Sequence, residues 1–245
     1  MSDNRFARRL EELDPQERQL AEAAVQAART SFTGFAEKPG PDYHQAPGLT
    51  AEDTWIRVAE ELGRVSALAT LEGYRDQTLA VSDIELIHRG IFEPVFGKET
   101  LGFRSLRKHG VQFPIVIGTS EDPHLGVRRG TGGKQVKQNL GKALAAFERD
   151  LLALQAADHL ALSDGARATV RLYAKIIGIH PFYDGNGRTA WAVFSYALQR
   201  CGLVEIAVPP SDATRWALGR ALRQDGSQSY EPLTDIVVDV IRSSA

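Results

Sequence analysis

Residues 179–191 gather several chemically active side chains into one short stretch, Ile-His-Pro-Phe-Tyr-Asp-Gly-Asn-Gly-Arg-Thr-Ala-Trp. His180 supplies an imidazole that moves protons near neutral pH, Asp184 a carboxylate suited to a metal ion, and Arg188 a fork of N–H donors suited to phosphate. The two glycines let a ligand approach the backbone closely. The stretch therefore has the composition of a phosphate site with a base or nucleophile, His180, beside it.

Two helical patterns flank this stretch. Apolar residues at helical spacing lead up to Ile179, and a second apolar stripe follows and ends near Gly202. The members of the second stripe are Ala190, Val193, Phe194, Ala197, Leu198 and Cys201. The glycines thus lie where a helix begins, and the unpaired N–H groups of a helix N-terminus attract anions.

The run from His180 to Arg188 resembles, without a gap, the signature of the Fic family, His-Pro-Phe-x-Asp/Glu-Gly-Asn-Gly-Arg-x-x-Arg. Trp191 stands where the family has its second arginine. Residues 87–92 and 101–104 also resemble the first conserved helix and turn of Fic domains, so that the resemblance covers roughly residues 81–224. A chance collection of turn residues would explain the glycines, but not the histidine, acid and arginine at these offsets. His88, in the first of these segments, is predicted to pack in the core.

The resemblance implies transfer of a nucleoside monophosphate, usually AMP from ATP, to a hydroxyl group of a target protein, with Mg²⁺ as cofactor. The implied site residues are His180 as general base, Asp184 as Mg²⁺ ligand, Gly185, Asn186 and Gly187 as a cradle of backbone and side-chain donors for the α- and β-phosphates, and Arg188 as the holder of a terminal phosphate.

Trp191 is expected to alter donor recognition. Arg188, Trp191 and Ser195 follow the spacing i, i+3 and i+7, which places Trp191 on the pocket side of the helix. An indole offers one N–H donor and no charge. A nucleotide other than ATP, or a diphosphate-linked donor, is therefore an alternative.

Glu72-Gly73 resembles the end of the inhibitory motif Ser/Thr-x-x-x-Glu-Gly/Asn of Fic proteins, although Leu68 replaces the expected hydroxyl residue. Glu72 is thus either an autoinhibitory residue or an ordinary last-turn residue before a C-terminal glycine. With Trp191 in place of arginine, Arg188 is the only strong ionic partner expected for Glu72. We therefore expect autoinhibition by Glu72 to be weak or absent.

The patterns predict a mainly α fold, a Fic-type helical bundle with a small β-hairpin flap. Residues 1–49 read as a helix and a Gly/Pro-rich linker, residues 50–80 as a helix that carries Glu72, and residues 81–245 as the Fic core with C-terminal helices. Thr50, Ser82 and Ser163 are predicted to cap helices.

The flap is predicted from residues 111–118, the one strongly strand-like run, which Pro114 confines to a sheet edge. In Fic proteins a hairpin at this place pairs with an extended segment of the target protein. Phe113, Ile115 and Val116 are the expected flap residues. A loose connector is the alternative.

Composition limits the other function classes. The 245 residues carry a net charge of −2, which favours neither nucleic acid nor an acidic membrane. A single cysteine excludes an internal disulfide, and no apolar run approaches the roughly 20 residues of a membrane span. We expect a cytoplasmic protein without nucleic-acid or membrane partners; an exported effector is the alternative.

Three function hypotheses remain. The first is the nucleotidyltransferase, with a target protein and a small separate antitoxin as expected partners. The second is a phosphotransferase like relatives of the Doc toxin, whose phosphate loop departs from the Gly-Asn-Gly found here at residues 185–187. The third, suggested only by Trp191, is a binding module that has lost catalysis.

Overall fold

The structure, a computed structural model, describes residues 4–32, 46–97, 102–104, 116–117, 128–129, 131–157, 161–203, 212–223 and 229–244. Its helices are α1 Pro15–Phe32, α2 Ala51–Tyr74, α3 Val81–Phe96, α4 Val136–Gln155, α5 Leu162–Ile179, α6 Asn186–Arg200, α7 Asp212–Arg223 and α8 Glu231–Ser244. Short 3-10 helices cover Arg5–Ala7, Leu10–Glu12 and Gly133–Gln135. The predicted mainly α fold is confirmed.

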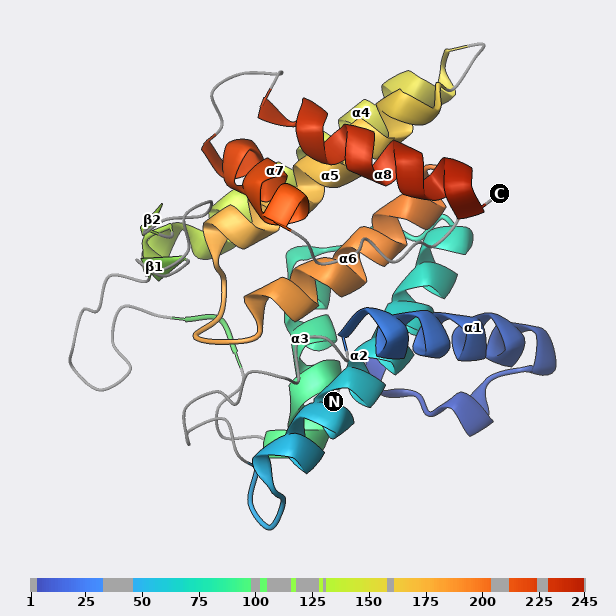
Figure 1. Cartoon of the computed structure of the whole chain (residues 1–245), viewed down its shortest axis with the longest axis vertical. Helices are drawn as coiled ribbons and strands as arrows, with labels where there is room; N and C mark the ends of the chain where they lie inside the picture. The colour runs from blue at the N-terminus through green and yellow to red at the C-terminus, as the bar shows by residue number, and fades with distance from the viewer. Residues whose placement is uncertain are drawn as a thin grey trace.

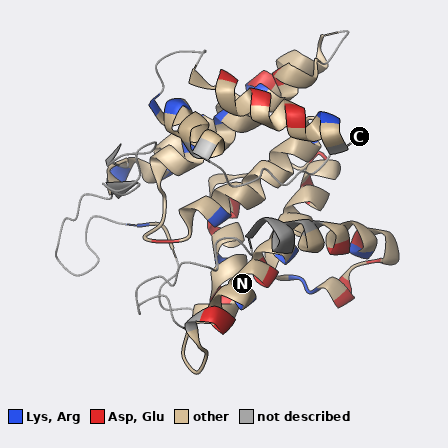
Figure 2. Cartoon of the chain, viewed as in Figure 1, with Lys and Arg blue, Asp and Glu red and all other residues tan. Residues whose placement is uncertain are grey.

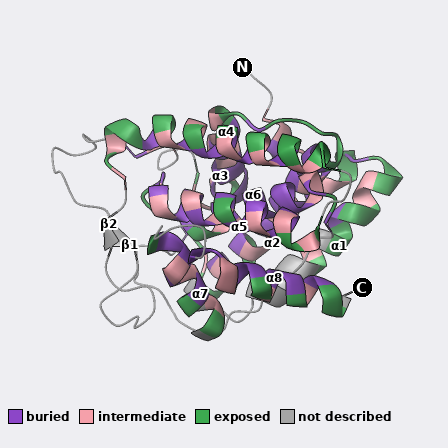
Figure 3. Ribbon diagram, turned by 90° about the horizontal axis from the view of Figure 1, so that it is seen from above, coloured by how far each residue is buried: buried purple, intermediate pink, exposed green. Residues whose placement is uncertain are grey.

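Helix α6 lies in the middle of the bundle, packed between α2 and α5 (Figure 1). Helix α4 and helix α8 cover α5, while α1 and α3 pack on α2. Helix α6 is buried along most of its length, and the outer helices present exposed faces (Figure 3). A helix that is buried on nearly all sides belongs to a core rather than a surface, so the first residues of α6 are held in place by the whole bundle.

Helices α2 and α6 run side by side in the same direction. Trp55, near the start of α2, contacts Arg188 near the start of α6. Gly73, near the end of α2, lies so close to α6 that a Cβ atom there would be 2.7 Å from the carbonyl oxygen of Tyr196. Only the N-terminal end of α2 therefore reaches the beginning of α6.

One of the three predicted caps is confirmed. The Thr50 hydroxyl accepts the Asp53 N–H at 3.0 Å and so caps α2. The predictions for Ser82 and Ser163 are wrong, because α3 and α5 begin after alanines, Ala80 and Ala161. At α3 the Asp83 carboxylate accepts the Ala80 N–H at 2.7 Å, which satisfies the helix start two residues before the serine.

The strand-like run forms part of a small antiparallel pair. Strand β1, Val116–Ile117, pairs with β2, Arg128–Arg129, so that Val116 lies opposite Arg129. Phe113 and Ile115 lie outside the described residues. The flap's pairing with a target protein stays a prediction, as does the division of the chain at residues 49 and 80.

Acidic and basic residues both occur on α1 and α8 (Figure 2), in keeping with the small net charge, and in α8 the acidic residues precede the one arginine. In the described part of the chain, none of the helices combines the length and apolar character needed to cross a membrane.

Glu72 lies at the C-terminal end of α2, where the N-terminal segment of the chain engages its carboxylate. One oxygen lies 2.5 Å from the Arg5 guanidinium and the other 3.3 Å from Arg75, and Arg5 also pairs with Asp83 at 2.8 Å. The expectation that Arg188 is the only strong ionic partner of Glu72 is wrong. Arg188 meets α2 at its opposite end, and the structure does not bring Glu72 to the loop of His180.

Glu72→Gln is expected to lower the free energy of unfolding by about 1 kcal/mol, because the Arg5 and Arg75 guanidinium groups each lose one of two carboxylate partners. Denaturant unfolding measures this. Asp76→Asn is the matched control, since the Asp76 side chain is 75% exposed in its pair with Arg200 and should contribute little. An unchanged stability for Glu72→Gln, together with tighter nucleotide binding, would instead support an inhibitory Glu72.

Candidate functional site

His180 occupies a left-handed turn directly after α5. Its backbone angles are φ 53° and ψ 63°, and its N–H donates to the Ile176 carbonyl at 3.0 Å. Among the described residues outside glycine, only Asp76 shares a positive φ. A histidine held in this sparsely populated region costs free energy, which the surrounding contacts must offset. The turn directs the chain from α5 toward the start of α6.

Arg104 is the main contact that holds this turn. Its guanidinium donates to the carbonyl oxygens of His180, Thr131 and Ile179, the last at 2.9 Å, and its backbone N–H donates to Pro181 at 2.9 Å. The carbonyls at the end of α5 have no intrahelical donors of their own. Arg104 therefore ends α5 and fixes the histidine backbone.

An aromatic stack with a side chain of α3 supports the loop. Phe182 is buried and stacks on His88 with ring centroids 3.7 Å apart and planes only 4° from parallel. His88 Nδ1 lies 3.0 Å from the Thr189 hydroxyl, which donates to the Gly185 carbonyl. Since the hydroxyl has one proton, both bonds require that His88 Nδ1 carry a hydrogen and donate. His88 packs in the core, as predicted, and positions the loop.

The side chain of Asn186 is used within the loop. Its Oδ1 accepts the Phe182 N–H at 2.9 Å and its Nδ2 donates to the Phe182 carbonyl at 3.0 Å. The amide oxygen and one N–H of this side chain thus close the loop on itself, and donation of the second N–H to a phosphate stays a prediction. The backbone N–H groups of Asn186, Gly187 and Arg188, in the first turn of α6, lack acceptors within the helix and stay suited to an anion.

The two glycines of the loop are not equivalent. Gly185 has φ +74°, and a Cβ atom there would lie 2.3 Å from the Phe92 ring and 3.1 Å from His88. At Gly187 a Cβ atom would meet nothing within 4 Å. Gly185 is thus required by the fold, whereas the open space at Gly187 lets a ligand come close to the backbone.

The His180 imidazole is neutral at physiological pH. Burial and the positive charge of Arg104 lower its pKa to about 4, while the Ile177 carbonyl and the Asp184 carboxylate act in the opposite direction. Nδ1 is buried and forms no hydrogen bond of standard geometry with the described residues. A neutral imidazole is the form that accepts a proton, so the environment favours a base over an acid.

Arg188 and Asp184 lie at the rim of the same loop. Burial lowers the pKa of Arg188 to about 10, and Asp184 opposes this shift. The exposed Asp184 accepts the Gly185 N–H at 2.6 Å. The described residues contain no group of three or more His, Cys, Asp or Glu that would hold a metal by itself. Mg²⁺ is often held by one carboxylate, phosphates and water, and Asp184 fits that need.

Trp191 is partly buried and packs against the core, with its ring 5.4 Å from that of Phe194. Ser195, at the next position of the predicted face, is buried and donates to the Trp191 carbonyl at 3.3 Å. Contact between Trp191 and a bound nucleotide stays a prediction.

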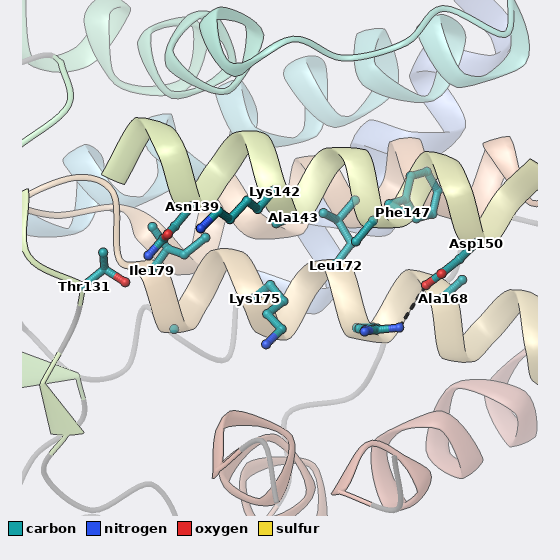
Figure 4. Close-up of a pocket in the computed structure, with 13 residues that line it drawn as sticks. Thr131, Asn139, Lys142, Ala143, Phe147, Asp150, Ala168, Leu172, Lys175 and Ile179 are labelled. Atoms are coloured by element: carbon teal, nitrogen blue, oxygen red, sulfur yellow. Dashed lines mark hydrogen bonds and ion pairs between the residues drawn. The ribbon is translucent and has the colours of Figure 1, made fainter. Parts of the chain in front are cut away.

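A cavity of about 300 Å³ lies between α4 and α5 (Figure 4). Lys142, Lys175 and the ion pair of Arg171 with Asp150 at 3.1 Å line it, and Ile179 closes the end nearest the loop. None of the predicted site residues that the structure describes borders it, so the candidate site is the His180 loop and not this cavity.

Sequence patterns alone did not identify Arg104, Thr189 or Trp55. Arg104 ends a segment that resembles a conserved turn of Fic domains, which was the available signal. Thr189 and Trp55 act through contacts with distant parts of the chain, and no local sequence pattern indicates these roles.

The model of the Fic/DOC family matches residues 78–198 of this chain. Among solved structures, a Fic domain containing signaling protein from Bacteroides thetaiotaomicron VPI-5482 is similar, with a TM-score of 0.63 and 14% identity over 96% of this chain and 89% of that chain. The C. elegans protein Fic-1 is similar with a TM-score of 0.54 and 16% identity, over 99% of this chain and 67% of that chain. At these identities the likeness shows a shared fold. No curated protein matches the chain in sequence.

Substitution of the two loop glycines should separate fold from binding. Gly185→Ala is expected to lower the free energy of unfolding by about 2–4 kcal/mol, from backbone strain and the clash with Phe92. Gly187→Ala should leave stability unchanged or slightly higher, and weaken Mg-ATP binding by bringing a methyl group to the anion site. Denaturant unfolding and calorimetric titration test both. Equal destabilisation by the two substitutions would contradict this assignment.

The titration of His180 is the second test. NMR should find a pKa near 4, so the ring stays neutral as the pH falls through 6.5. Because the folded pKa lies below the unfolded value, this group's contribution to stability is complete above pH 6.5 and is lost as the pH falls toward 4. Arg104→Gln should raise the pKa by removing a positive charge, whereas Arg104→Lys should raise it less. A wild-type pKa of 6.5 or above would refute the neutral base.

Proposed function

Since residues 78–198 belong to the Fic/DOC family, we propose that this Fic-domain protein transfers a nucleoside monophosphate, first of all AMP from ATP, to a hydroxyl group of a target protein. One observation carries the proposal. A half-buried, neutral imidazole lies on the same loop as the N-terminus of a core helix that bears an arginine, and Arg104 holds this loop in place.

His180 is proposed to activate the acceptor. A Ser, Thr or Tyr hydroxyl is a poor nucleophile until its proton is removed. The neutral imidazole takes that proton as the acceptor oxygen forms a bond to the α-phosphorus. The bond from that phosphorus to the bridging oxygen breaks, and pyrophosphate leaves with the electron pair. The left-handed turn and Arg104 keep the base oriented throughout.

The start of α6 is proposed to hold the phosphates. Its first-turn N–H groups would donate to the α- and β-phosphates, and the Arg188 fork would hold a terminal phosphate. Asp184, with the nucleotide phosphates, would hold Mg²⁺, which supplies charge neutralisation at the phosphoryl oxygens. Asn186 contributes by its backbone, and its side chain keeps the cradle in shape.

The proposed partners are a target protein that pairs with the β1–β2 edge and a small antitoxin, and the proposed location is the cytoplasm. Two alternatives concern the reaction: phosphate transfer as in Doc relatives, and a donor other than ATP because Trp191 replaces an arginine. The impaired binding module is the third. The lowered pKa of His180, which keeps its imidazole neutral, and the Arg104 contacts that hold its backbone support a working enzyme over the impaired binding module.

Intact-protein mass after incubation with Mg²⁺ and ATP, GTP, CTP or UTP tests the proposal. The expected result is a gain of one nucleoside monophosphate, on the protein itself or on added Ser-, Thr- and Tyr-containing peptides. His180→Ala should slow the transfer by about 10²–10⁴-fold, since it removes a general base.

His180→Gln should slow the transfer, and His88→Gln is its matched control, because only His180 is assigned a proton transfer. A gain of one phosphate would place the protein with the Doc-like phosphotransferases. Absence of any gain that depends on His180, on protein and peptides alike, would contradict the transferase.

A further inference from the structure

We infer that Trp55 of α2 is a positioning residue for Arg188, so that a helix outside the family-matched segment completes the phosphate site. This inference rests on the proposed function, because it assigns Arg188 to a terminal phosphate of the donor. It concerns how the Arg188 guanidinium is oriented and which nucleotide donors it selects.

The geometry is an aromatic clamp, defined here as Trp55, Arg188 and Phe92. The guanidinium carbon lies 4.2 Å from the centre of the Trp55 ring and 5.5 Å from that of Phe92. Trp55 comes from α2, Phe92 from α3 and Arg188 from α6. Three helices must therefore keep their relative places for the stack to form.

Stacking leaves the arginine chemically available. Attraction to a ring acts on the face of the guanidinium, whereas its N–H donors point outward in the plane. Within the part of the chain that the structure describes, the Arg188 guanidinium forms neither a direct ion pair nor a hydrogen bond, and the Asp184 carboxylate acts on it only through the electrostatic field. A partly buried cation that is stacked but not neutralised is preorganised for an anion.

The neighbours of the clamp explain why the stack is fixed. Thr50 caps the first turn of α2, directly before Trp55. Arg64 ties α2 to α3 by donating to the Gly90 carbonyl at 3.0 Å. Phe92 is in turn pressed against Gly185, where no Cβ atom would fit. The Phe92 ring thus has little room to move on the side of Gly185, and α2 is tied to α3 near the residues that contact the guanidinium.

Fixed orientation matters more here than in a site with two arginines. Trp191 occupies the position of the second arginine of the motif, so Arg188 is the one cation of residues 180–191 available for the far end of a phosphate chain. A guanidinium held in one plane binds phosphate through two parallel N–H bonds. The clamp should therefore favour a donor with a terminal phosphate over a nucleoside monophosphate.

Calorimetric titration with Mg²⁺ and ATP, ADP or AMP tests this in the His180→Ala protein, which binds without turnover. Trp55→Ala should weaken ATP binding about ten-fold and leave AMP binding unchanged. Trp55→Phe should retain most of the ATP affinity. Trp216→Ala removes an exposed tryptophan on α7 and should change neither.

A double-mutant cycle separates positioning from general damage. If Trp55 acts through Arg188, Trp55→Ala should have no further effect on ATP binding once Arg188→Ala is present. Equal losses for ATP and AMP, additive effects in the cycle, or no ATP binding to the His180→Ala protein would overturn the inference. Tighter ATP binding in Trp55→Ala would also overturn it, since the stack would then be a barrier to the donor.

The outcome is independent of the transfer assay. Selective loss of ATP affinity without any transfer would leave the clamp in place and reject the proposed chemistry. Transfer that depends on His180 but not on Trp55 would support the proposed chemistry and reject the clamp.

Discussion

The reversal of the chain between α5 and α6 depends on the guanidinium of Arg104. The last carbonyls of α5 point toward the loop without helical donors, and a buried carbonyl left in that state costs about 1–3 kcal/mol. Arg104 satisfies the carbonyls of Ile179 and His180 and reaches Thr131 before α4. A lysine has one ammonium group and no planar fork, so it would not span these acceptors.

The same residue sets the electrostatics of the site. Its charge, added to burial, keeps the His180 imidazole neutral, and Arg188 at the other rim forms no direct ion pair with a described residue, although the nearby Asp184 carboxylate acts to raise its pKa. The loop therefore places a base that resists protonation among cations. Such an arrangement favours both removal of a proton from an acceptor and accumulation of negative charge on a bound phosphate. Structural support and chemistry are thus supplied by the same guanidinium.

The local parts of this site could be predicted from the sequence. Offsets within residues 180–188 place a histidine, an acid and an arginine around a helix start, and periodicity predicts the two flanking helices. Contacts with a distant partner could not be predicted in this way: Glu72 pairs with Arg5, which lies 67 residues away. Patterns record which face of a helix is apolar, but not which charged group folding brings to its end.

The parallel packing of α2 and α6 limits how α2 could influence the site. Its C-terminal end is fixed, because Gly73 lies against the backbone of Tyr196 with no room for even one more carbon atom. Glu72 at that end is engaged by Arg5, and the adjacent Gly73 meets α6 about 15 Å from its first turn, at 1.5 Å per residue. Sliding of α2 would have to break both contacts at once. Any effect of this helix on the donor must therefore pass through its N-terminal turns, where the side chain that meets α6 is an indole and not a carboxylate. This geometry favours a role for α2 in holding Arg188 in place over a role as an inhibitory switch through Glu72.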